Sequence, residues 1–78
     1  MNQYEAEQRI INAIKQIKGS NISINSDSRL FGDLGFDSLA FMEFVVYLES
    51  EFGVDLEKLV VMVDDLSVYS LAGFIIQP

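Results

Sequence analysis

The chain contains no cysteine and no histidine, and only five of its 78 residues are basic. Without cysteine, a disulfide framework and a cysteine-based zinc site are excluded, and the protein has no thiol of its own. Without histidine, it lacks the commonest general base and the commonest metal ligand. We therefore predict that the protein is not an enzyme and that it has no metal site.

The charge balance is strongly acidic, with 12 acidic residues, five basic residues and a net charge of −7. Such a surface repels nucleic acid and anionic membranes and attracts proteins with basic surfaces. No apolar run is long enough to span a membrane, and the first nine residues lack the apolar core of a signal peptide. We therefore expect a cytoplasmic monomer that binds no nucleic acid and has no membrane span.

Hydrophobic periodicity and cap residues predict an all-helical domain that comprises residues 1–78. The predicted helices run from Gln3 to Lys18, from Ser38 to Phe52, from Asp55 to about Val63, and from Val68 to about Ile76. The expected N-cap residues are Asn2, Asp37, Asp55 and Ser67, and the expected ends of the first two helices are Gly19 and Gly53. A strand is the alternative for the third segment, because its run LVVMV (59–63) is rich in β-branched residues.

The first and last helices each have one apolar side that is expected to face the core. In the first helix this stripe consists of Ile10, Ile11, Ile14 and Ile17, and Tyr4 and Ala6 extend it toward the N-terminus. In the last helix the inward residues are Leu71, Phe74 and Ile75.

The connection between the first two helices, residues 20–37, is long and rich in Ser, Asn, Asp and Gly. Structureless loops of this length are uncommon in compact domains and are often functional. Its apolar residues are expected to contact the core; they are Ile22, Ile24, Leu30, Phe31 and Leu34. A strand at 21–25 is an alternative, but it has no obvious pairing partner.

The second predicted helix is apolar on two sides. The first side, here called the core stripe, consists of Phe41, Phe44, Val45, Leu48 and Phe52. The second side, here called the outer stripe, consists of Leu39, Met42 and Val46, and it stops at Glu49. Either the helix is buried nearly all round, or the outer stripe is exposed as a docking surface. We favour exposure, because small domains contain few fully buried helices.

Acidic residues surround the outer stripe, and they favour its role in docking. Asp37, Glu43 and Glu49 border it, and no basic residue occurs between Arg29 and Lys58. An apolar patch with a charged rim is typical of a protein interface, and the acidic field would attract a basic partner. The alternative is an acidic face that contacts only solvent.

Ser38 follows a glycine turn and begins the second predicted helix, in the sequence Gly35-Phe36-Asp37-Ser38-Leu39. Free N–H groups and the positive end of the helix dipole favour an anion at such a place. A phosphodiester on the Ser38 hydroxyl would therefore be stabilised. Taken alone, a serine at a helix start is more often only a cap.

The sequence around Ser38 resembles the acyl carrier protein family. The resemblance is carried by LFGDLGFDSL (30–39), MEFV (42–45), LESEFG (48–53) and SVYSLA (67–72). It implies a four-helix bundle of the acyl-carrier type, with a long first loop and a short third helix. It also implies that a phosphopantetheinyl transferase moves a 4'-phosphopantetheine arm from coenzyme A onto Ser38. The terminal thiol of the arm then carries acyl groups as thioesters in fatty acid, polyketide or related biosynthesis.

The same resemblance implies which residues contact partners, namely acyl-loading and acyl-using enzymes with basic docking surfaces. The residues that match the family's recognition helix are Asp37, Leu39, Met42, Glu43 and Glu49, and Val46 joins them as part of the outer stripe. The chain departs from the family pattern at Phe36 and Phe41, which are larger than usual and could narrow the space that shelters an acyl chain in some members. Residues 57–66 match the family pattern poorly, so the resemblance does not identify the acyl group that the chain carries.

Two rival functions from other classes are rejected on sequence. A Gly-Asp-Ser-Leu serine hydrolase needs a longer chain and a histidine base, and Phe36 interrupts its motif here. An EF-hand with Gly32 as its invariant glycine would place Arg29 and Phe31 at ligand positions, where neither binds calcium. This rejects a site with EF-hand spacing, and loose surface binding of divalent ions by the acidic second helix is left open.

Two closer alternatives share the expected fold. One is an aminoacyl or peptidyl carrier of a nonribosomal peptide system, although the acidic second helix and the Asp-Ser-Leu sequence favour acyl cargo. The other is an interaction domain that keeps the fold without the modification.

Overall fold

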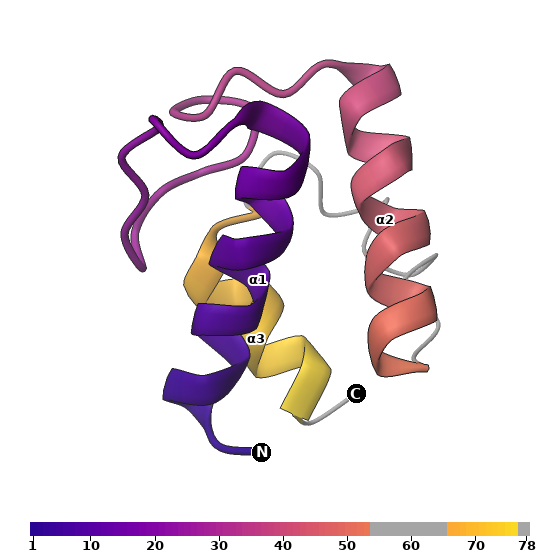
Figure 1. Ribbon diagram of the computed structural model, residues 1–78. Coiled ribbons are helices and arrows are strands. Elements are labelled where there is room, and N and C mark those ends of the chain that lie inside the picture. Colours follow the sequence, from indigo (N-terminus) through magenta and orange to yellow (C-terminus); the bar gives the residue numbers. More distant parts are fainter. Residues whose placement is uncertain (54–65, 77–78) are drawn as a thin grey trace.

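The computed structural model describes residues 1–53 and 66–76. In these ranges the chain forms three helices, α1 (Gln3–Lys18), α2 (Ser38–Phe52) and α3 (Val68–Ile76), and no strand longer than one isolated bridge. The helices α1 and α2 run in opposite directions, and α1 packs against both α2 and α3 (Figure 1). The all-helical class is thereby confirmed, and the predicted third segment, 55–63, lies outside the described residues.

The three described helices begin where cap residues predict, and α1 and α2 also end where Gly19 and Gly53 predict. At α1, the Asn2 side chain accepts a hydrogen bond from the Glu5 N–H at 2.8 Å, and the Asn2 N–H donates to the Glu5 carboxylate at 3.4 Å. Gly53 ends α2 in the left-handed conformation, with φ at 68°. At α3, the Ser67 hydroxyl accepts from the Ser70 N–H at 3.1 Å. These side chains satisfy N–H groups that have no partner within their own helix.

The core is built from the inward faces of all three helices and from the long loop. In α1 the buried residues are Ala6, Ile10, Ala13 and Ile14, and in α3 they are Val68, Leu71, Ala72 and Ile75. Ile11, Ile17 and Phe74 are only partly buried against this core. The prediction for Tyr4 was wrong, because its side chain is 70% exposed. Two positions along a helix correspond to roughly 200° around its axis, so Tyr4 lies nearly opposite Ala6.

The long loop contacts the core through its apolar residues, as predicted. Leu30 and Leu34 are buried, and Ile22, Ile24 and Phe31 are partly buried against the core. No strand forms at 21–25. The loop instead pairs with residues 66–68, at the start of α3: the Leu30 N–H donates to the Leu66 carbonyl, and the Val68 N–H donates to the Ser28 carbonyl, each at 3.1 Å. This pairing fixes the path of the loop toward the start of α2.

Candidate functional site

Ser38 is the first residue of α2, and it is exposed to solvent. The N-cap residue before it, Asp37, accepts a hydrogen bond from the Ala40 N–H at 2.8 Å. The Ser38 hydroxyl makes no hydrogen bond with any residue that the structure describes. Because Asp37 performs the capping, the hydroxyl of Ser38 is not needed for the helix start and is accessible for chemistry. Ser38 is therefore the residue after the N-cap, and its hydroxyl does not cap the helix.

The Gly35–Asp37 turn places Ser38 at the end of the loop. Gly35 has a φ of 69°, in the left-handed region that glycine adopts readily and other residues rarely do. The next residue, Phe36, is buried, and its N–H donates to the Leu30 carbonyl at 3.0 Å. One polar contact and one buried ring thus fix the backbone two residues before Ser38.

Two aromatic pairs attach the first half of α2 to the loop. The rings of Phe36 and Phe44 meet edge to face with centroids 5.5 Å apart, and those of Phe31 and Phe41 are tilted at 5.3 Å. Such pairs contribute about 0.5–1.5 kcal/mol beyond the burial of their area. Phe36 and Phe41 are both buried. Their large side chains therefore occupy space beside the first turns of α2, and their effect on the cargo stays a prediction.

The two apolar sides of α2 differ as the periodicity predicts. Phe41, Phe44, Val45 and Leu48 of the core stripe are buried, and Phe52 is partly buried. The outer stripe is exposed, with Leu39 at 71%, Met42 at 54% and Val46 at 60% of their full area. The alternative of a helix buried all round is therefore wrong. That the outer stripe binds partners is not tested by its exposure and stays a prediction.

Acidic side chains lie beside the outer stripe. Asp37 and Glu43 are exposed, whereas Glu49 is partly buried. Sequence analysis missed Tyr47, which is 38% exposed and lies one turn after Glu43. The spacing of four residues from an acidic rim position is the signal that would have identified it. The exposed side of α2 is thus larger and more aromatic than the outer stripe alone.

Asp37→Ala is expected to lower the free energy of unfolding by about 1 kcal/mol, because the Ala40 N–H loses its partner. Thermal or urea denaturation measures this change. Asp37→Asn is the matched control, since its amide oxygen can still cap the helix while its negative charge is lost. Equal destabilisation by both variants would show that charge, not the capping hydrogen bond, stabilises the start of α2.

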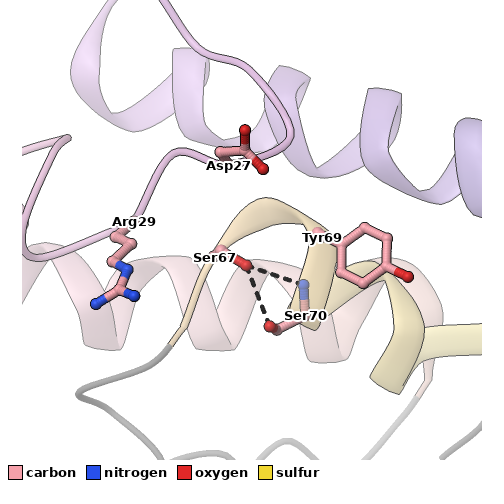
Figure 2. A pocket seen from close by; sticks show the side chains of 5 residues that line it. All are labelled: Asp27, Arg29, Ser67, Tyr69 and Ser70. Carbon is pink, nitrogen blue, oxygen red and sulfur yellow. Dashed lines mark hydrogen bonds between the residues drawn. The ribbon is translucent and has the colours of Figure 1, made fainter.

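A depression of about 310 Å³ lies between the loop and the start of α3 (Figure 2). It is lined by Asp27, Arg29, Ser67, Tyr69 and Ser70. The Ser67 and Ser70 hydroxyls are 3.1 Å apart and belong to the N-cap of α3. None of the lining residues belongs to α2 or to the Gly35–Asp37 turn, so this depression is separate from Ser38.

Neither a cluster of metal-ligating side chains nor a membrane-spanning helix is found in the part of the chain that the structure describes. Within residues 1–53 and 66–76, no three acidic side chains come close enough together to hold a metal ion. Over the same ranges, every helix is too short or too polar to cross a bilayer.

The residues around Ser38 fit a covalently attached phosphodiester. The hydroxyl is exposed and has no partner in the described chain, and the first N–H that Asp37 satisfies is that of Ala40. The earlier N–H groups of α2, on Ser38 and Leu39, have no carbonyl partner within the helix and favour negative charge nearby. A group with a flexible arm attached here would extend into solvent rather than into the core.

Comparison with known proteins gives consistent matches. The family model described as "Phosphopantetheine attachment site" matches residues 8–75. A curated "Acyl carrier protein" of Rickettsia bellii (strain RML369-C) is 46% identical over 50 residues, which are 63% of this chain and 58% of that protein. Another, from strain OSU 85-389, is 44% identical over 50 residues, or 63% of this chain and 62% of that protein. The matched segment thus spans about three fifths of the Rickettsia proteins.

A third curated "Acyl carrier protein", from Lactobacillus acidophilus, is 34% identical over 56 residues, which are 65% of this chain and 70% of that protein. No solved structure matches the chain significantly. The family model extends over most of the chain, from α1 into α3, and it includes the whole of the loop, the Gly35–Asp37 turn and α2.

Proposed function

Since the chain belongs to the acyl carrier protein family of phosphopantetheine-bearing domains, we propose that Ser38 is the residue to which its 4'-phosphopantetheine is attached. The observation that carries this assignment is the exposed Ser38 hydroxyl, which has no hydrogen-bond partner in the described chain. The attached arm supplies the thiol that a chain without cysteine lacks. The protein then acts as a carrier of acyl thioesters, not as an enzyme.

The chain's own residues present and orient the attachment point. Asp37 caps α2, because its carboxylate accepts a hydrogen bond from the Ala40 N–H. The hydroxyl of the neighbouring Ser38 is therefore not used for capping. The buried Phe36 ring, packed on Phe44, fixes the backbone before Ser38. A hydroxyl held at a constant place on a rigid helix start is easier to align with a transferase than one on a mobile loop.

We propose further that the outer stripe and its acidic rim form the surface that partners recognise. The partners are a phosphopantetheinyl transferase and acyl-loading or acyl-using enzymes of fatty acid, polyketide or related biosynthesis. Exposed Leu39, Met42 and Val46 supply apolar contact area, and the acidic side chains beside them attract a basic surface. Association with such partners is expected to slow as the salt concentration rises.

The experiment that tests the proposal is incubation of the chain with coenzyme A and a phosphopantetheinyl transferase, followed by intact mass spectrometry. A gain of one phosphopantetheine arm supports the carrier function, and no gain supports an unmodified interaction domain. The arm-bearing chain is then offered to an acyl-loading enzyme and to an amino-acid-activating enzyme. Loading by the second alone would support the aminoacyl carrier alternative.

Met42→Glu is expected to reduce the rate of arm transfer by about tenfold or more, because a charge replaces an apolar contact at the interface. Its thermal stability should stay close to that of the wild type, since Met42 is exposed. The matched control is Tyr4→Glu, which adds the same charge at an exposed apolar position on α1. An equal loss of rate in the control, or a large loss of stability in Met42→Glu, would contradict the docking role.

A further inference from the structure

Lys18, the last residue of α1, contacts the turn that leads to Ser38. Its ammonium nitrogen Nζ donates a hydrogen bond to the Gly35 carbonyl at 3.1 Å. The same nitrogen lies 5.8 Å from the centroid of the Phe36 ring. The sequence identifies Lys18 only as the last residue of the first predicted helix. The structure instead uses it to connect α1 with the two residues before the N-cap of α2.

Phe36 is buried in the core, but few polar contacts hold the Gly35–Asp37 turn within the described residues, so the hydrogen bond from Lys18 matters for its order. The described backbone bonds give the turn one hydrogen bond to the loop, from the Phe36 N–H to the Leu30 carbonyl at 3.0 Å. The Phe36 ring packs on Phe44 of α2. These two contacts join the turn to residues close to it in the sequence, in the loop and in α2. The Lys18 contact joins the turn to α1, which is more distant in the sequence. A segment with few contacts to distant parts of the fold opens locally at a low free-energy cost.

We propose that Lys18 is a positioning residue: its contacts with Gly35 and Phe36 hold the Gly35–Asp37 turn in place and so set the orientation of the Ser38 hydroxyl. This role rests on the proposed function of Ser38 as the attachment point. A charged donor on a carbonyl and a cation over an aromatic ring are both stronger than their neutral counterparts. A change that removes the charge of Lys18 therefore loosens the turn without altering Ser38 or the outer stripe.

The direction of the change in kcat distinguishes a positioning role of Lys18 from a general effect of its charge on association with the transferase. Loss of a positive charge makes an acidic protein more acidic, which by itself would speed its encounter with a basic transferase and lower KM. A positioning role predicts the opposite for turnover, because the hydroxyl is held less often in the reactive orientation. The value of kcat should therefore fall while KM for the chain stays constant or falls.

The test compares Lys18→Met, Lys18→Arg and the matched control Lys15→Met. Lys15 lies in the same last turn of α1 and is exposed, and its side chain has no hydrogen bond, ion pair or ring contact among the residues that the structure describes. The first readout is kcat and KM for arm transfer from coenzyme A. The second, made without transferase, is hydrogen exchange of the Phe36 amide, with the Val68 amide as a reference for global opening, since it is bonded to the Ser28 carbonyl.

Lys18→Met is expected to lower kcat by about three- to tenfold and to raise Phe36 exchange by a similar factor, with Val68 exchange unchanged. Lys18→Arg, which keeps the charge and the donors, should stay within about twofold of the wild type. Lys15→Met should change neither readout. If the wild-type chain gains an arm and Lys18→Met behaves like Lys15→Met, this inference is overturned and the carrier function stands. An equal rise in Phe36 and Val68 exchange would overturn it as well, and a wild-type chain that gains no arm would overturn both.

Discussion

Ser38→Ala is expected to abolish the gain of the phosphopantetheine arm completely while the fold is kept. The loss is total because the hydroxyl oxygen is the atom that forms the phosphodiester, and no neighbouring serine occupies the start of α2. The fold is kept because Ser38 is exposed and its hydroxyl has no partner in the described chain. An exposed substitution of this kind changes the free energy of unfolding by roughly 0.5 kcal/mol or less.

Intact mass spectrometry after incubation with coenzyme A and transferase measures the first effect, and thermal denaturation the second. Ser50→Ala is the matched control, because Ser50 is an exposed serine on the same helix, near its other end. The control should gain one arm, as the wild type does. An arm on the Ser38→Ala chain would show that the attachment point lies elsewhere.

Phe44→Ala is expected to lower the free energy of unfolding by about 3–5 kcal/mol, the cost of removing a large buried ring. Phe44 has no exposed area, and its ring packs edge to face on Phe36. Small domains have total stabilities of roughly 5–15 kcal/mol, so this one substitution removes a large part of the stability. The same change also deprives the Gly35–Asp37 turn of the ring on which Phe36 rests.

Urea denaturation of Phe44→Ala, compared with Met42→Ala, measures this effect. Met42 lies on the same helix but is 54% exposed, so its truncation should cost about 1 kcal/mol or less. Leu48, which is fully buried one turn further along, should behave like Phe44, with a loss of about 2–5 kcal/mol on truncation to alanine. A loss below about 1 kcal/mol in Phe44→Ala would mean that the core stripe and the outer stripe are reversed.

The helix boundaries could be predicted from the sequence because local chemistry determines them. Asn2, Asp37 and Ser67 each cap a helix by contacts within a few residues, and Gly19 and Gly53 end α1 and α2 for equally local reasons. The two sides of α2 were predictable from their spacing. The position of Tyr4 was not, because an aromatic residue near the first turn was assigned to the stripe without regard to its angle around the helix.

The contacts that position Ser38 could not be predicted, because they join segments distant in sequence. Nothing in the local pattern says that Lys18 reaches the Gly35 carbonyl, or that Ser28 and Leu30 pair with residues 66–68. These contacts depend on how the long loop folds back on the helices. The role proposed for Ser38 rests on the family resemblance, since the residue alone has the local features of an ordinary helix start.

The most direct test of the account is to locate the arm on the chain. Trypsin cleavage after Arg29 and Lys58 releases the segment 30–58, in which the only serines are Ser38 and Ser50. Fragmentation of this peptide from the transferase-treated wild-type protein distinguishes the two. The account predicts the added mass on Ser38 and none on Ser50, and an added mass on Ser50 or on any residue outside this peptide would contradict it.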